Sequence, residues 1–161
     1  MSSRTEITSA KRLVIKVGSS SLTSAGGGLN IERVQSIIAA IAAAQASSVQ
    51  VVLVSSGAVA AGLPALKLTA RPTDLAQQQA AASIGQGLLI AQYAAAAAAQ
   101  GFAVGQVLLT QEDITRRSNY RNAKQTFEAL LQLKVLPIVN ENDVVATAEL
   151  KYGDNDRIEA L

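Results

Sequence analysis

The first group of residues suited to chemistry is Lys16 and the Gly/Ser segment after it, which includes Gly18 and Ser19. A glycine with consecutive hydroxyl residues lets backbone N–H groups turn toward an anion. Burying an unpaired ammonium is costly, so a lysine within an aliphatic segment is expected to meet an anion. The alternative is a strand-end lysine whose ammonium reaches solvent. The segment is not a Walker P-loop, because Lys16 precedes the glycine.

A second group, Ser56 and Gly57, follows another aliphatic segment and stands where a short helix is expected to begin. Glycine allows a ligand to approach closely, and a helix N-terminus offers N–H groups and partial positive charge. A carboxylate or a phosphate is therefore the ligand that we expect here. An ordinary N-cap explains the same residues without any ligand.

The third group combines amides with carboxylates. Asn140 and Asp143 belong to one cluster, and Asp154, Asn155 and Asp156 form another, with the alternating pattern of a hairpin over residues 144–151 between them. Two such clusters joined by a hairpin can face one site, where they could hold a ligand ammonium, orient hydroxyls or carry the waters of Mg²⁺. Asx-rich turns are the alternative interpretation.

Composition narrows the chemistry that these groups can perform. The 161 residues include no cysteine, histidine or tryptophan, while 49% are hydrophobic and 16% are charged. Disulfides, thiolate nucleophiles, Cys/His zinc sites and Ser-His-Asp triads are thereby excluded. Phosphoryl transfer remains, because it depends on positioning and charge stabilisation. The basic residues are dispersed and aromatics make up only 3%, so nucleic acid is not an expected partner.

Four segments rich in branched aliphatic residues predict the buried parallel strands that position these groups: residues 13–17, 49–54, 104–109 and 135–139. Helical patterns separate the strands, at residues 31–41 after the N-cap Asn30, 56–62, about 73–100 with Asp74 at its start, and 119–133. Strands that alternate with helices predict an α/β fold with helices on both faces of a parallel sheet. Ligands bind such sheets at the carboxyl ends of the strands.

One proline lies within the last predicted strand. Pro137 donates no N–H to a ladder, which predicts a sheet edge or the start of a strand.

The chain contains no credible apolar run of about 20 residues and no N-terminal apolar segment of the secretory type, so we expect no membrane association and a cytoplasmic location.

The order and spacing of these motifs resemble bacterial glutamate 5-kinases, a family with the amino acid kinase fold. The similar segments are residues 14–20, 54–62, 138–143 and 146–156, and the resemblance covers nearly the whole chain. It implies a three-layer αβα sandwich with a mainly parallel sheet. It also implies phosphorylation of the L-glutamate side-chain carboxylate by ATP and Mg²⁺, the first step of proline biosynthesis, with proline as a possible feedback inhibitor.

The resemblance implies roles for single residues. Lys16 corresponds to the lysine that contacts ATP phosphates and stabilises charge in transfer, with Gly18 and Ser19 beside it, and Asp156 to an acid of the catalytic region. The residues that it places at or near glutamate are Ser56, Gly57, Asn140, Asp143, Asp154 and Asn155. It assigns no protein ligand to a metal.

The family pattern continues beyond the second acid-amide cluster with a half that supplies most of the nucleotide site, and many members add a PUA domain. We therefore expect residues 1–161 to be the N-terminal, substrate-binding part of a longer enzyme. A sheet without its later strands exposes an edge and apolar side chains, so a homo-oligomer is expected. The alternatives are a kinase of another small acid with the same fold, or a non-catalytic fragment that binds glutamate or proline.

Overall fold

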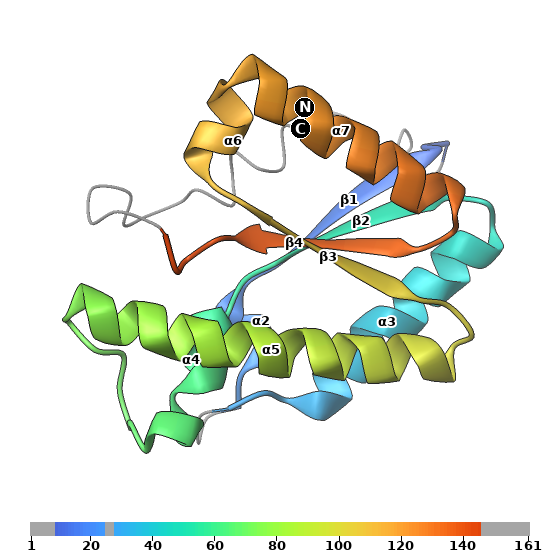
Figure 1. Cartoon of the computed structure of the whole chain (residues 1–161). Coiled ribbons are helices and arrows are strands. Elements are labelled where there is room, and N and C mark those ends of the chain that lie inside the picture. The colour runs from blue at the N-terminus through green and yellow to red at the C-terminus, as the bar shows by residue number, and fades with distance from the viewer. Residues whose placement is uncertain (1–8, 25–27, 146–161) are drawn as a thin grey trace.

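The computed structural model describes residues 9–24 and 28–145 of the chain. Within them, four strands form one parallel sheet in the order β1-β2-β4-β3 (Figure 1). The four predicted strands are confirmed, with ends shifted by at most two residues. Their bounds are Arg12–Val17 for β1, Gln50–Ser55 for β2, Val104–Leu109 for β3 and Leu136–Glu141 for β4.

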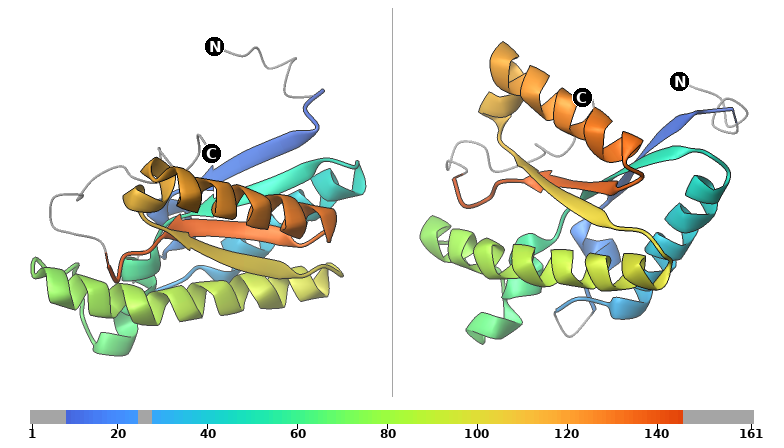
Figure 2. Two further views of the ribbon diagram at one scale, coloured as in Figure 1. Left: turned by 45° about the horizontal axis from the view of Figure 1, so that its top comes forward. Right: turned by 45° about the vertical axis from the view of Figure 1, so that its right-hand side comes forward.

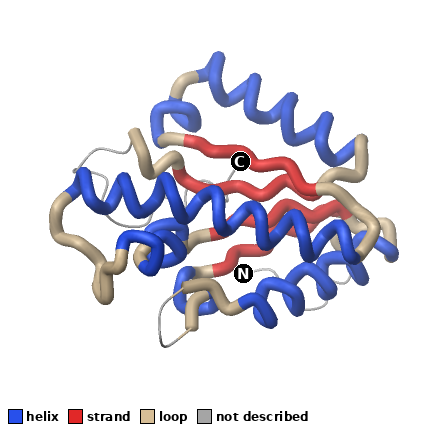
Figure 3. The backbone as a smooth tube through the Cα atoms, turned by 60° about the horizontal axis from the view of Figure 1, so that its bottom comes forward, coloured by secondary structure: helices blue, strands red, loops and turns tan. Residues whose placement is uncertain are grey.

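Helices cover both faces of the sheet. Figures 1 and 2 show α6 and α7 on one face and α3, α4 and α5 on the other, so the predicted three-layer α/β sandwich is confirmed. The long helix α5 crosses the strands on its face (Figure 3). The helices are α2 (Ser19–Leu22), α3 (Ile31–Ala46), α4 (Ala58–Gly62), the 3-10 turn η1 (Pro64–Leu66), α5 (Leu75–Ala99), α6 (Gln111–Thr115) and α7 (Arg117–Gln132).

The starts of α3 and α5 follow from local chemistry, as the sequence predicts. The Asn30 side chain accepts a hydrogen bond from the Arg33 N–H at 3.1 Å and caps α3. The Asp74 carboxylate accepts one from the Gln77 N–H at 2.9 Å and caps α5. Gly101, with φ +84°, adopts the left-handed conformation just after α5, which favours glycine.

Buried side chains divide between the two faces of the sheet. Leu136 and Ile138 of β4 belong to the core against α3 and α5, whereas Val139 belongs to a smaller cluster under α7. Because successive side chains of a strand alternate between faces, Asn140 continues the α5-facing series. Ser55 of β2 lies on that face as well, since its hydroxyl is hydrogen-bonded to the Tyr93 hydroxyl of α5 at 3.1 Å.

Pro137 lies inside the sheet, because β4 pairs with β2 on one side and β3 on the other. The prediction of a sheet edge is therefore wrong, and the prediction of a strand start is confirmed. The Leu136 N–H donates to the Ala103 carbonyl toward β3, so the nitrogen of Pro137 faces β2. Pairing with β2 begins only at Leu53 and Ile138, so no ladder hydrogen bond is lost.

Two glycines bring α4 and α5 into backbone contact. A Cβ atom at Gly85 of α5 would overlap the carbonyl oxygen of Ala58, and one at Gly62 of α4 would overlap that of Ala81. Because α4 begins directly after Gly57, this contact couples the loop after β2 to the middle of α5.

Candidate active site

The loops that carry the predicted site residues meet at the carboxyl edge of the sheet. Hydrogen bonds extend the strand pairing past the strand ends: the Ser56 N–H donates to the Val17 carbonyl at 2.9 Å, and the Asn142 N–H donates to the Leu109 carbonyl at 2.8 Å. The segment after β2 thus adjoins the end of β1, the segment after β4 adjoins the end of β3, and β2 pairs with β4, so these segments share the carboxyl edge where parallel sheets bind ligands.

Gly57 joins the first two of these segments. Its φ of +100° and ψ of 9° lie in the left-handed region, which favours glycine. A Cβ atom there would lie 3.4 Å from the Cα of Ser19, so the loop after β2 packs closely on the turn after β1. The N-cap of α4 is Gly57, so the segment of Ser56 and Gly57 does contain the N-cap of this helix.

Lys16 has an exposed side chain near the carboxyl end of β1. Alternation along the strand puts it on the same face as Arg12, whose guanidinium bonds Glu128 of α7 at 2.9 Å. Burial of this lysine was expected from its aliphatic neighbours, and that expectation is wrong, because β1 is an outer strand. A ligand that contacts both Lys16 and Asn140 has to reach across the carboxyl edge, since the two residues lie on opposite faces.

Asn140 offers an unused hydrogen-bond donor at this edge. Only 4% of the residue is exposed, and its Oδ1 accepts a hydrogen bond from the Glu141 N–H at 2.9 Å. Its buried Nδ2 has no hydrogen-bond partner among the residues that the structure describes. Leaving a buried donor unsatisfied costs roughly 1–3 kcal/mol, so a ligand oxygen at this position would be stabilising.

Asp143 is a partly buried acid three residues after Asn140, in the loop that follows β4. Burial raises the pKa of its carboxyl above the ordinary value, while the positive charge of Arg71 and a hydrogen bond from the Gln86 side chain act in the opposite direction. The ionised carboxylate is thus incompletely compensated in this structure. A ligand ammonium would stabilise it.

Gln86 of α5 reaches the end of β4 from the face of the sheet that α5 covers. It is 7% exposed, and its Nε2 donates to the Glu141 carbonyl at 3.3 Å while its Oε1 accepts from Gln106 Nε2 at 3.2 Å. Gln86 is not among the site residues predicted from the sequence. A signal was present, because Gln86 interrupts the buried stripe of Ala82, Leu89 and Tyr93 at helical spacing.

Three predicted site residues, Asp154, Asn155 and Asp156, lie outside the described residues, as does most of the hairpin predicted over residues 144–151. Their roles stay predictions. Of the others, six lie at the carboxyl edge of the sheet: Gly18, Ser19, Ser56, Gly57, Asn140 and Asp143. Lys16 lies near the same edge, but on the opposite face of the sheet from Asn140.

The family model that describes the amino acid kinase family matches residues 11–161. The chain belongs to the amino acid kinase family. Curated relatives named glutamate 5-kinase include those of Salinispora arenicola, 59% identical over 98% of this chain, Streptomyces coelicolor, 56% over 98%, and Thermobifida fusca, 54% over 98%. The aligned segments are 43%, 42% and 41% of those relatives, so the chain spans about two-fifths of their length.

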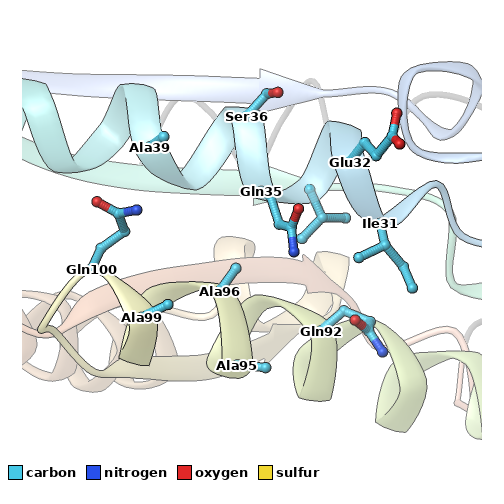
Figure 4. Close-up of a pocket in the computed structure, with 11 residues that line it drawn as sticks. Ile31, Glu32, Gln35, Ser36, Ala39, Gln92, Ala95, Ala96, Ala99 and Gln100 are labelled. Carbon is cyan, nitrogen blue, oxygen red and sulfur yellow. The ribbon is translucent and has the colours of Figure 1, made fainter.

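Two grooves of this amino acid kinase chain lie away from the carboxyl edge. One of about 530 Å³ separates α3 from α5 and is lined by Ile31, Gln35 and Gln92 among others (Figure 4). Another of about 670 Å³ includes Phe102 and Lys134 at the amino ends of the strands. Neither includes a predicted site residue, so their chemistry is not that of the candidate active site.

Proposed function

We propose that this chain is the glutamate-binding part of a glutamate 5-kinase, an enzyme that transfers the terminal phosphoryl group of ATP to the side-chain carboxylate of L-glutamate. The names of the curated relatives support this substrate over another small acid. The observation that carries the proposal is that the unsatisfied Asn140 Nδ2, at the end of β4, and the partly buried Asp143 carboxylate, in the loop after it, lie three residues apart. A donor and an acid so placed suit a ligand that carries both a carboxylate and an ammonium.

In this proposal each end of glutamate has a partner. The α-ammonium pairs with Asp143, and Asn140 donates to a carboxylate oxygen. The segment of Ser56 and Gly57 receives the other oxygens, with Asp154 and Asn155 completing the glutamate site.

The transfer itself needs no general base. A carboxylate with an ordinary pKa of about 4.3 is already ionised at neutral pH and can attack phosphorus directly. A bond forms between that oxygen and the γ-phosphorus, the bond to the ADP oxygen breaks, and ADP leaves with glutamyl 5-phosphate as the product. Lys16 stabilises charge on the phosphoryl oxygens, Gly18 and Ser19 contact ATP, and Asp156 contributes to the catalytic region. The lack of histidine in the chain agrees with this chemistry.

Mg²⁺ would enter with ATP and neutralise the charge of its phosphates. The described residues contain no group of three or more acidic or histidine side chains that could hold a metal ion.

The remaining proposals concern the setting of the enzyme. We place the ATP-binding half and any PUA domain outside residues 1–161, and the span of about two-fifths of the relatives supports this. We further propose a cytoplasmic location, proline as a feedback inhibitor, and assembly with further copies, supported by Val14, 49% exposed on the outer strand β1. No helix of the described segments combines the length and apolarity needed to cross a bilayer.

Titration calorimetry with a panel of small acids tests the proposed substrate. We expect the chain to bind L-glutamate more tightly than L-aspartate, which is one methylene shorter, and than N-acetyl-L-glutamate, whose nitrogen carries no positive charge. Tighter binding of either competitor would replace glutamate as the substrate. Absence of glutamate binding would contradict the assignment of a glutamate site to this chain.

A further inference from the structure

The amide of Gln86 is hydrogen-bonded at both its nitrogen and its oxygen. An amide side chain has two N–H donors and one acceptor oxygen. Its Nε2 donates to the Glu141 carbonyl at 3.3 Å, and its Oε1 accepts from Gln106 of β3 at 3.2 Å. These contacts connect α5 to β3 and to the last residue of β4, two residues before Asp143, whose pKa the Gln86 side chain acts to lower.

The orientation of this amide follows from its partners. The Glu141 carbonyl is an acceptor, so the nitrogen of Gln86 faces it. A reversed amide would place Oε1 against that carbonyl oxygen. Gln106 then supplies the donor that the outward-facing oxygen requires.

The backbone that carries Gln86 is held on the opposite side. The preceding residue, Gly85, packs directly on the backbone of α4, and α4 begins after Ser56 and Gly57. The position of Gln86 is thus defined by the same contact that places the loop after β2. Functional groups held by rigid elements keep their geometry better than groups on isolated loops.

We propose, on the basis of the function proposed above, that Gln86 is a positioning residue: its hydrogen bond to the Glu141 carbonyl holds the end of β4 so that Asp143, two residues further on, receives the ammonium group of the substrate, with Gln106 completing the hydrogen bonding of Gln86. Gln86 itself does not contact the reacting atoms. In a merely structural role, Gln86 would only satisfy buried hydrogen-bonding groups. The two roles differ in whether loss of Gln86 changes the preference for a ligand with an ammonium group.

The test compares L-glutamate with glutarate, which has the same two carboxylates and no ammonium. In calorimetry with the variant Gln86→Met, which keeps the length of the side chain and removes its hydrogen bonds, we expect affinity for glutamate to fall about tenfold, the equivalent of one charge-assisted hydrogen bond. Affinity for glutarate should stay nearly unchanged. The matched control Gln92→Met lies on the same helix and lines the groove toward α3, and it should leave both affinities unchanged (Figure 4).

A second variant guards against loss of folding at the buried position. Gln106 is exposed, so Gln106→Met leaves the core intact and should lower glutamate affinity in the same selective way by a smaller factor. Equal losses for glutamate and glutarate in both variants, or no loss for either ligand, would overturn the positioning role.

A ligand-free readout separates this inference from the proposed function. In a carbon NMR titration, Gln86→Met should raise the pKa of the Asp143 carboxyl further, because a hydrogen bond that favours the ionised form is lost. Arg71, the charged group that acts on Asp143, remains in the variant. An unchanged pKa would refute the effect of Gln86 on Asp143. If the parent chain binds no glutamate but this pKa still rises in Gln86→Met, the effect of Gln86 on Asp143 is confirmed and the substrate assignment is wrong. The positioning role, which depends on that substrate, is then wrong as well.

Discussion

The backbone contact between α4 and α5 predicts opposite effects for two alanine substitutions in one helix. A Cβ atom at Gly85 would lie 2.7 Å from the carbonyl carbon of Ala58 and 2.8 Å from the nitrogen of Gly62. Both atoms belong to the backbone of α4, so no side chain can rotate away and the two helices must separate. At Gly87, two residues along the same helix, nothing lies within 4 Å of the new Cβ atom.

The magnitudes follow from these surroundings. Overpacking typically costs 1–3 kcal/mol, and a backbone obstruction belongs at about the upper end of that range. Replacing glycine by alanine within a helix stabilises by about 1 kcal/mol. We therefore expect Gly85→Ala to lower the free energy of unfolding by about 2 kcal/mol, whereas Gly87→Ala should raise it by about 0.4–1 kcal/mol.

Urea denaturation followed by far-UV circular dichroism measures both variants. Because Gly85 adjoins Gln86 and faces the start of α4, Gly85→Ala should also weaken glutamate binding, while Gly87→Ala should not. Equal free energies of unfolding for the two variants would refute the close packing of α4 on α5.

Three further predictions concern single side chains. Tyr93→Phe removes the buried hydrogen bond to Ser55 and should lower the free energy of unfolding by about 1 kcal/mol in urea denaturation. Hydrogen bonds from the Thr110 side chain and N–H lower the pKa of Asp113. Their stabilisation of the folded state is therefore present above the ordinary carboxyl pKa and is lost as pH falls through the lowered value. Asp113→Asn should reduce the fall in the free energy of unfolding at acid pH, and an unaltered fall would contradict this. Lys16→Ala in an active glutamate 5-kinase should lower kcat by about 10²-fold in a coupled ATP assay, and an unchanged kcat would remove Lys16 from the mechanism.

Much of the fold could be predicted because its elements are encoded locally. Branched aliphatic segments marked the four strands, and Asn30 and Asp74 marked helix starts through their own side-chain hydrogen bonds. The short helices α2 and α6 were missed, because four or five residues are too few for a helical period, whereas the equally short α4 was predicted at residues 56–62. The central position of Pro137 depends on strand order, which the spacing of the segments does not specify.

The candidate site was predictable as a set of loops and less so as an arrangement of side chains. Asn140 and Asp143 stood out as polar residues after a buried strand, and both lie at the carboxyl edge. Lys16 was expected to be buried because the sequence does not reveal that β1 is an outer strand. Gln86 was overlooked because its partners, Gln106 and the loop after β4, are distant in the chain and meet only in the folded sheet.

The central claim is that Asp143 receives the ammonium of glutamate, and a cycle of one substitution and one ligand change tests it most directly. Calorimetric affinities for L-glutamate and glutarate are compared in the parent chain, in Asp143→Asn, and in the control Glu112→Gln at an exposed position. We expect the parent and the control to prefer glutamate by about tenfold or more, and Asp143→Asn to lose that preference. A preference that survives in Asp143→Asn would contradict the assignment of the ammonium site to Asp143.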